Sequence, residues 1–331
     1  MNRDHSVLMG RALTGIAVCA AVTPAFAQQA SAAYPDRPIR IVVGYPPGGS
    51  SDFSARVLGT RLATALNQSV VIDNRGGAAG NIANEIVVRA VPDGYTLLVT
   101  AEASITINAS VYSNLPFVAA RDLTAITQII KYANVVVVNP SLPVTSVKEL
   151  IAYAKANPGK LSASNPGTGT AQHLAVELFK LTVGVNITTV PYKGGGPAMI
   201  SLVGNETQVS FATPPSAMPQ VKAGRLRAIA VTSDKRSAVL PDLPTISEAG
   251  LAGFNVEGWV GVFAPVKTPA AVVDKLNRES AKILRLPEVK EAALGVGSEP
   301  VGNSPREANQ IVRDETAMWA KVVKTLGIKI E

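Results

Sequence analysis

A short apolar strand that runs through a glycine turn directly into a helix most constrains what this 331-residue chain can fold into. Residues 39–66 form one copy of this pattern, and residues 161–182 form a second copy in the other half of the chain. A strand as short and β-branched as residues 39–43 is typical of a parallel sheet that is buried on both faces. Because short strands alternate with helices, the sequence predicts an α/β protein with parallel sheets covered by helices.

The first glycine turn has the composition of an anion-binding site. Pro46–Gly49 ends the strand, Ser50 or Ser51 can serve as the N-cap of the helix, and Asp52 favours its first turn. The first amides of a helix have no partner within it, and the helix dipole places partial positive charge at that end. A carboxylate or phosphate could therefore bind there without Arg or Lys. The alternative is a structural turn that binds nothing.

The second glycine turn, at residues 165–170, suggests where a ligand would bind. Ligands of α/β sheets lie beyond the carboxyl ends of the strands, where both turns fall. Two such turns in separate halves predict a cleft between two domains. The residues expected on its walls are Gly48, Gly49, Ser50 and Ser51 on one side and Thr168, Gly169 and Thr170 on the other.

Two charged residues near these turns each have two interpretations. The Asp52 carboxylate would repel an anion that it faced, so Asp52 either stabilises the first helical turn or contacts the ligand through water. Lys193 lies in a glycine-rich loop after a strand at residues 187–190. It either supplies a positive charge to the ligand or is a solvated loop lysine.

The N-terminus, residues 1–27, has the features of a secretory signal peptide. It carries two arginines, an apolar stretch at residues 12–22 that is too short to span a membrane, and Ala-Phe-Ala at residues 25–27. Lipidation would need a small residue before Cys19, where Val18 stands. Cleavage after residue 27 would remove the only cysteine, so the mature protein is predicted to be exported and to contain neither disulfide nor thiol.

Several classes of function lack the residues that they need. The formal charge of +7 comes from scattered basic residues, and only 5% of residues are aromatic, so no nucleic-acid surface is predicted. His173 would be the only histidine left after cleavage, which nearly excludes a zinc site of His and Cys. A hydrolase would have to use this histidine from inside a predicted helix, and no G-x-S-x-G elbow occurs. Nucleotide-binding glycine motifs are incomplete, and no cofactor is expected.

At these residues the chain resembles the Bug-type periplasmic solute-binding receptors of tripartite tricarboxylate transporters. The resemblance covers nearly all of the mature chain and follows the family's order of motifs. Among them are PPGGSSD, VIDNRGGAAGNIA, PDGYTLL, GKLSASNPGTGTAQHLA, VPYKGGGPA and LPDLPTISEAG. Together they are far more specific than a single glycine turn.

The resemblance implies a type II periplasmic-binding-protein-like fold. In that fold two doubly wound α/β lobes are joined by crossing strands and close like a Venus flytrap over a ligand cleft. We expect the first lobe at residues 34–133 plus 264–331 and the second lobe at residues 134–263.

The resemblance also implies a ligand site. In the family, a carboxylate is held between the loops that match residues 48–52 and 168–170, by main-chain amides, hydroxyls and water. The far end of the ligand reaches loops that here contain Ser104, Lys193 and Thr213. Many relatives place an acidic residue after the strand that ends at residue 211, where this chain has Ala-Thr, so any ligand group that such an acid would contact is left open.

The function implied is capture of a small mono- or dicarboxylate, including aromatic acids, in the periplasm. The protein would deliver the ligand to the membrane permease subunits of the transporter, as a monomer, without a metal or cofactor and without catalysing a reaction. One alternative is a ligand-sensing receptor that signals to a membrane kinase. Another alternative is an exported hydrolase that uses a serine and His173.

Overall fold

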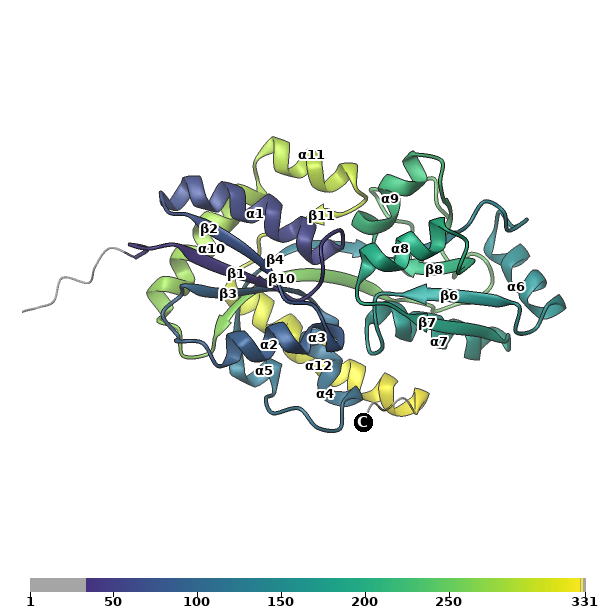
Figure 1. The fold of residues 1–331 in the computed structure, drawn as a ribbon, viewed down its shortest axis with the longest axis horizontal. Helices are drawn as coiled ribbons and strands as arrows, with labels where there is room; N and C mark the ends of the chain where they lie inside the picture. Colours follow the sequence, from purple (N-terminus) through teal and green to yellow (C-terminus); the bar gives the residue numbers. More distant parts are fainter. Residues whose placement is uncertain (1–33, 328, 330–331) are drawn as a thin grey trace, which may run out of the picture. The chain divides into compact units, whose positions relative to one another are not determined.

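Two β-sheets organise the residues that the computed structural model describes, which are 34–327 and 329 (Figure 1). The strand order is β11-β4-β10-β3-β1-β2 in the first sheet and β7-β6-β8-β5-β9 in the second. Each sheet and its helices form one lobe, which confirms the predicted two-lobed α/β fold. The predicted signal peptide lies outside the described residues.

The strands of the first sheet are β1 (Ile39–Val43), β2 (Val70–Asn74), β3 (Thr96–Ala101), β4 (Leu123–Ala133), β10 (Glu257–Pro265) and β11 (Glu299–Pro300). Those of the second sheet are β5 (Val135–Val138), β6 (Leu161–Asn165), β7 (Ile187–Pro191), β8 (Val209–Ala212) and β9 (Arg227–Val231).

The helices follow the same division. The first lobe contains α1 (Ser50–Leu66), the 3₁₀ turn η1 (Ala78–Gly80), α2 (Asn81–Val88), α3 (Ala103–Thr106), α4 (Asn108–Val111), α5 (Ala119–Asp122), α10 (Ala270–Leu284), α11 (Pro287–Gly295) and α12 (Pro305–Leu326). The second lobe contains α6 (Val147–Ala156), α7 (Ala171–Val183), α8 (Gly195–Val203) and α9 (Pro214–Lys222).

Strand β1 shows why its sequence is apolar at nearly every position. Ile39 and Ile41 pack on one face of the sheet in the same buried cluster as Leu58 of α1. Val42 packs on the opposite face in the same cluster as Val87 of α2. Because helices cover both faces (Figure 1), every side chain of the strand except that of Arg40 is buried.

Both sheets are mixed, so the prediction of wholly parallel sheets was wrong. The βαβ units keep parallel pairs, such as β1 with β2 and β3, and β6 with β7 and β8. In contrast, β10 is antiparallel to β3 and β4, and β5 is antiparallel to β8 and β9. The antiparallel pairs involve the strands next to the two crossings between the sheets, where no helix precedes the next strand.

The chain crosses between the sheets at two adjacent points. The outward crossing is at Asn134, between β4 and β5, and the return is between Val256 and Glu257. The buried Asn134 side chain joins them, because its Nδ2 donates to Val256 O at 2.9 Å. The lobe boundary expected between residues 263 and 264 lies inside β10, which pairs with β3 and β4 of the first sheet. We therefore propose the return crossing at residues 256–257 as the boundary.

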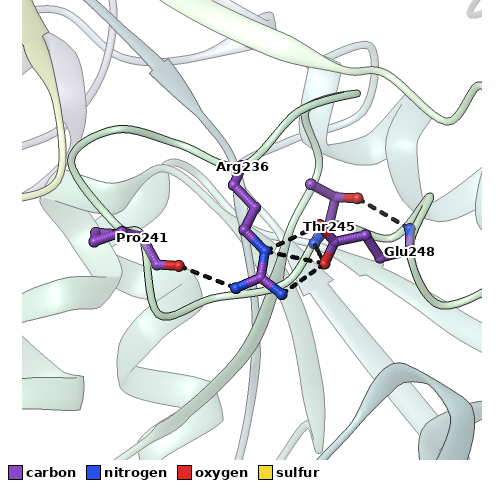
Figure 2. A network of polar contacts seen from close by, with 4 residues as sticks. All are labelled: Arg236, Pro241, Thr245 and Glu248. Atoms are coloured by element: carbon purple, nitrogen blue, oxygen red, sulfur yellow. Dashed lines mark hydrogen bonds and ion pairs between the residues drawn. The ribbon is translucent and has the colours of Figure 1, made fainter.

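The loop before the return crossing is held by one arginine, shown in Figure 2. Arg236 donates through Nε and Nη2 to the Glu248 carboxylate at 2.9 Å and through Nη1 to Pro241 O at 3.2 Å. Glu248 N in turn donates to Thr245 Oγ1 at 3.0 Å. The ion pair lowers the pKa of Glu248, but both side chains are exposed, so its contribution to stability is small.

Helix α12 begins on the first lobe and ends against the second. Ala308 and Val312 belong to the buried cluster that contains Val42 of β1. Trp319 and Val323 belong to the cluster that contains the core of the second sheet. Residues 305–326 therefore form a helix that packs on both lobes. Among the described helices, none has the length and apolar composition that a membrane span requires.

Candidate functional site

A cavity lies between loops of the two lobes, at the carboxyl ends of strands. The empty space at this place, adjoining solvent included, is about 350 Å³. Its lining residues are Tyr45, Gly49, Ser50, Ser51, Ala101 and Ala103 from the first lobe and Pro166, Thr170, Gln172, Gly195 and Thr213 from the second. We call this the main cavity.

The first wall of the main cavity is the N-terminus of α1. The N-cap is Gly49, with extended backbone and no side-chain hydrogen bond, so the prediction that Ser50 or Ser51 caps this helix was wrong. Both serines lie in the first turn instead. Ser51 Oγ is buried without a hydrogen-bond partner among the described residues, and Ser50 Oγ lies 3.4 Å from Tyr132 Oη. The helix therefore presents unpaired amides and a spare hydroxyl at its positive end.

Asp52 directs its carboxylate toward partners within the first lobe. It accepts hydrogen bonds from Gly48 N at 3.2 Å, Arg56 Nε at 3.0 Å and Asn74 Nδ2 at 3.1 Å. These contacts offset its negative charge near the cavity and support its role as a stabiliser of the first turn. Gly48, with φ of +91°, lies on the rim opposite Gly196. Neither Gly48 nor Asp52 lines the main cavity, and the ligand contacts predicted for these two residues stay predictions.

The second wall is the N-terminus of α7. Thr170 is its N-cap, since Oγ1 accepts from His173 N at 3.2 Å while donating to Gly167 O at 2.7 Å. Gln172 also lines the cavity, and its Nε2 donates to Asn134 Oδ1 at 2.6 Å. Because Asn134 joins the two crossings, this contact connects the cavity wall to the place where the chain passes between the lobes.

In the loop before α7, Gly169 lies against the first lobe instead of lining the main cavity. A Cβ on Gly169 would lie 3.3 Å from Asn108 Oδ1 and 3.4 Å from the Tyr112 ring. Tyr112 Oη donates to Thr168 O at 3.4 Å. His173 Nδ1 accepts from Gly169 N at 3.3 Å, and burial lowers the pKa of His173. The histidine that a hydrolase would need is therefore engaged in holding this loop.

A second cavity adjoins the first, because Tyr45 and Pro166 line both. It encloses about 650 Å³, adjoining solvent included, and its other walls are residues 77–79, Tyr112, 167–168 and 191–193. Thr168 and Lys193 therefore belong to this second cavity. Lys193 is exposed and forms no ion pair within the described part of the chain.

The turn that forms one wall of the second cavity has a strained backbone. Ala78 and Ala79 have φ of 47° and 50°, a left-handed conformation that costs a non-glycine residue about 1 kcal/mol or more. Two hydrogen bonds hold it, from Tyr45 Oη and from Asn108 Nδ2 to Ala79 O, both at 3.1 Å. The turn in return fixes the Tyr45 ring where the two cavities meet.

Two further predicted residues differ in position. Thr213 is the N-cap of α9 and lines the main cavity, with Oγ1 3.0 Å from Ser216 Oγ. Ser104 is buried, with Oγ 2.8 Å from Thr100 Oγ1 and 3.1 Å from Ala101 O, and lines neither cavity. Of the predicted site residues, the main cavity thus brings together Gly49, Ser50, Ser51, Thr170 and Thr213. Thr168 and Lys193 line the second cavity. The predicted residues that line neither cavity are Gly48, Asp52, Ser104 and Gly169.

Sequence reasoning missed several lining residues. They are Tyr45, Ala101, Pro166 and Gln172, whereas Ala103 and Gly195 fall in the loops of Ser104 and Lys193 that the resemblance placed at the far end of the ligand. Their positions at or just after the ends of β1, β3 and β6 would have identified Tyr45, Ala101 and Pro166, since ligands lie beyond strand ends. Gln172 gave no such signal, because it falls inside a predicted helix.

Two lobes that each place a helix N-terminus at one cavity fit a solute-binding protein, and the family and the solved neighbours that match this chain are solute-binding proteins, not enzymes. The chain belongs to the tripartite tricarboxylate transporter family receptors, whose sequence model matches residues 54–328.

Individual members of the family match over nearly their whole length. Protein BugT of Bordetella pertussis is 35% identical over 324 residues, which are 98% of this chain and 99% of BugT. The solved structure of Rpa4515 from R. palustris with adipate is 38% identical, with a TM-score of 0.87, covering 89% of this chain and 99% of the other. MatC from Rhodopseudomonas palustris with bound malate is 29% identical, with a TM-score of 0.83, covering 88% and 100%.

Proposed function

We propose that this protein captures a small carboxylate in the periplasm and delivers it to the membrane permease of a tripartite tricarboxylate transporter. The observation that carries the proposal is the main cavity itself. Helices α1 and α7 both begin there, and the Ser51 hydroxyl has no hydrogen-bond partner among the described residues. Amides and hydroxyls at two helix N-termini suit a carboxylate without a basic side chain.

We further propose a dicarboxylate as the preferred ligand. One acid group would occupy the main cavity, and the other would extend past Tyr45 toward Lys193 in the second cavity. The unpaired charge of Lys193 suits a second carboxylate, and it discriminates against a ligand with an apolar end. The adipate and malate bound to the two solved relatives are both dicarboxylates, which supports this choice.

Capture would operate through a shift in population between open and closed forms. The main cavity takes lining residues from both lobes, so a ligand makes all its contacts only when the lobes meet. The crossings at Asn134 and Val256 are where such a motion would bend. The permease would then bind the closed form, with the receptor acting as a monomer.

A thermal-shift screen of the purified protein tests this proposal. Mono-, di- and tricarboxylates and aromatic acids would be compared with an amine and a sugar. We expect dicarboxylates to raise the melting temperature most, because ligand at 100 times Kd stabilises the native state by about 2.7 kcal/mol. A shift with the amine or sugar and with no carboxylate would contradict the anion site.

Two lysine variants test the dicarboxylate preference separately. Lys193→Ala should weaken adipate binding, make it less dependent on salt and leave the binding of a monocarboxylate nearly unchanged. Lys160→Ala, at an exposed position away from both cavities, is the matched control and should bind both ligands like the wild type. Equal loss of both ligands in Lys193→Ala would contradict a second acid group at this residue.

A further inference from the structure

The main cavity has a buried carboxyl group beside it that the proposed function does not use. Glu102 lies between Ala101 and Ala103, which both line the cavity, and it is only 1% exposed. Its Oε2 accepts a hydrogen bond from Trp259 N at 3.1 Å. Its Oε1 is buried and has no hydrogen-bond partner among the described residues. A carboxylate in such a place costs free energy unless something offsets its charge.

Among the described residues, no cation offsets this charge. The titratable groups that face Glu102 are Tyr45 after β1, Tyr132 of β4 and Glu315 of α12. Glu315 accepts from Trp259 Nε1 at 2.8 Å and itself faces Glu257 of β10. Every one of these groups is either neutral or acidic, so none stabilises a Glu102 anion.

The pKa values follow from this environment. Burial first, and Glu315 second, raise the pKa of Glu102 to about 8, against the hydrogen bond from Trp259 N. Burial likewise raises the pKa of Glu315 to about 7. Burial also raises the pKa of Tyr45 and of Tyr132, so both phenols stay neutral. Glu102 is therefore mostly protonated at neutral pH.

We propose that Glu102 is a neutral carboxylic acid when ligand is bound and that its proton makes carboxylate capture proton-linked. The inference rests on the proposed function. A ligand carboxylate in the main cavity would add a second negative charge next to Ala101 and Ala103, in a place with a low dielectric constant. Like charges near each other disfavour ionisation, so an anionic ligand and the Glu102 anion would destabilise each other.

The sign of the pH dependence follows from linkage. The anionic ligand raises the pKa of Glu102 further, so the bound protein holds more protons than the free protein at alkaline pH. Affinity is therefore constant where Glu102 is protonated in both states, and it falls as pH rises through the pKa of the free protein. The slope is at most tenfold per pH unit, for one proton, between about pH 7 and 9.

The test measures adipate binding by calorimetry from pH 6 to pH 9, with malate as a second probe. At pH 8 the titration is repeated in two buffers with different enthalpies of ionisation, which reveals proton uptake as a buffer-dependent heat. Glu102→Gln replaces the acid with an amide that cannot titrate, so its affinity should lose the alkaline decline. Glu291→Gln, on the exposed side of α11, should keep the wild-type pH profile.

A second measurement does not depend on ligand. Infrared difference spectra between wild type and Glu102→Gln should show the carbonyl band of a protonated carboxylic acid at pH 7, and this band should disappear as pH rises through about 8. If Glu102→Gln does not fold, the titration of this band in the wild type still decides whether Glu102 is protonated at neutral pH. If every carbonyl band of a buried carboxylic acid is already absent at pH 6, the proposal is overturned.

The outcomes separate this inference from the function on which it rests. If wild type and Glu102→Gln bind adipate with parallel pH profiles and no buffer-dependent heat, the inference is overturned while the receptor function stands. If neither protein binds a carboxylate at any pH, the receptor function fails, and the infrared titration alone decides the protonation of Glu102. A decline in wild type that is absent in Glu102→Gln supports the inference.

Discussion

Two buried serines on α1 separate a ligand-binding role from a structural one at the level of single residues. Ser51 and Ser54 are both buried, and both hydroxyls have no hydrogen-bond partner among the described residues. Only Ser51 lines the main cavity. The unpartnered hydroxyl of Ser51 is therefore available to a ligand, whereas that of Ser54 is not.

We predict that Ser51→Ala weakens dicarboxylate binding by roughly tenfold or more, since a hydrogen bond to a charged group contributes about 1.5–3 kcal/mol. Stability should change little, because the substitution breaks no hydrogen bond within the described residues. Calorimetry and urea unfolding measure the two effects. Ser54→Ala is the matched control, with a similar effect on stability and unchanged affinity; equal losses of affinity in both variants would contradict the placement of the site.

The sequence could predict only those site residues whose role depends on the turn in which they lie and not on contacts from elsewhere in the fold. Gly49 and Thr170 were predictable because a glycine turn before a helix exposes amides wherever it occurs. The orientation of Asp52 was not predictable, because it depends on Asn74, which the fold brings from another strand. Tyr45 was missed since an aromatic residue after a strand has no polar pattern to mark it.

At the scale of elements, α12 holds the two lobes together. Its N-terminal half packs on the first lobe, and Trp319 joins the buried cluster of the second sheet. Near its end, Leu326 shares a surface hollow with Leu181 of α7 and with Val185 just after this helix. The helix therefore contributes to the stability of both lobes.

We predict that Trp319→Ala lowers the free energy of unfolding by about 3–5 kcal/mol, because the substitution leaves a large cavity in a packed core. Met318→Ala changes the neighbouring residue, which is about half exposed, and should cost less than about 1 kcal/mol. Urea unfolding of the two variants measures the difference. Similar midpoints would mean that the end of α12 is not packed as described.

Sequence patterns predicted helices and strands better than they predicted which strands pair with each other. The bounds of β1 followed from its short, β-branched apolar run. The apolar residues of β10 could not indicate which sheet this strand joins, because both sheets bury strands on two faces. Helix α11 and the two-residue strand β11 were missed, since neither is long enough to show a clear period.

The two lobes contact each other through main-chain atoms where Gly196 lies against Pro47 and Gly48. A Cβ on Gly196, in α8 of the second lobe, would lie 2.7 Å from Pro47 O of the first lobe. Real Cβ atoms do not approach a carbonyl oxygen so closely, and neither side is a flexible side chain that could give way. The observed approach of the two lobes therefore requires glycine at this position.

We predict that Gly196→Ala folds normally but binds dicarboxylates roughly tenfold more weakly, a loss of about 1.4 kcal/mol, because its methyl group keeps the lobes apart. Small-angle X-ray scattering should show that saturating ligand compacts the variant less than the wild type. Gly295→Ala, in a helix with no atom within 4 Å of the new Cβ, is the control and should behave like the wild type. Wild-type affinity and compaction in Gly196→Ala would contradict the contact.

The two crossings also set an order in which the lobes can be completed during folding. All strands of the second sheet come from one continuous stretch, residues 135–231. The first sheet lacks its central strand until β10 is available, and the contact between Trp259 and Glu102 spans 157 residues. Closing so long a loop costs more entropy than the local pairings of the second lobe. The lobe that begins the chain is therefore the last to be finished, and its exposed β3 and β4 edges must wait for the inserted lobe to be made.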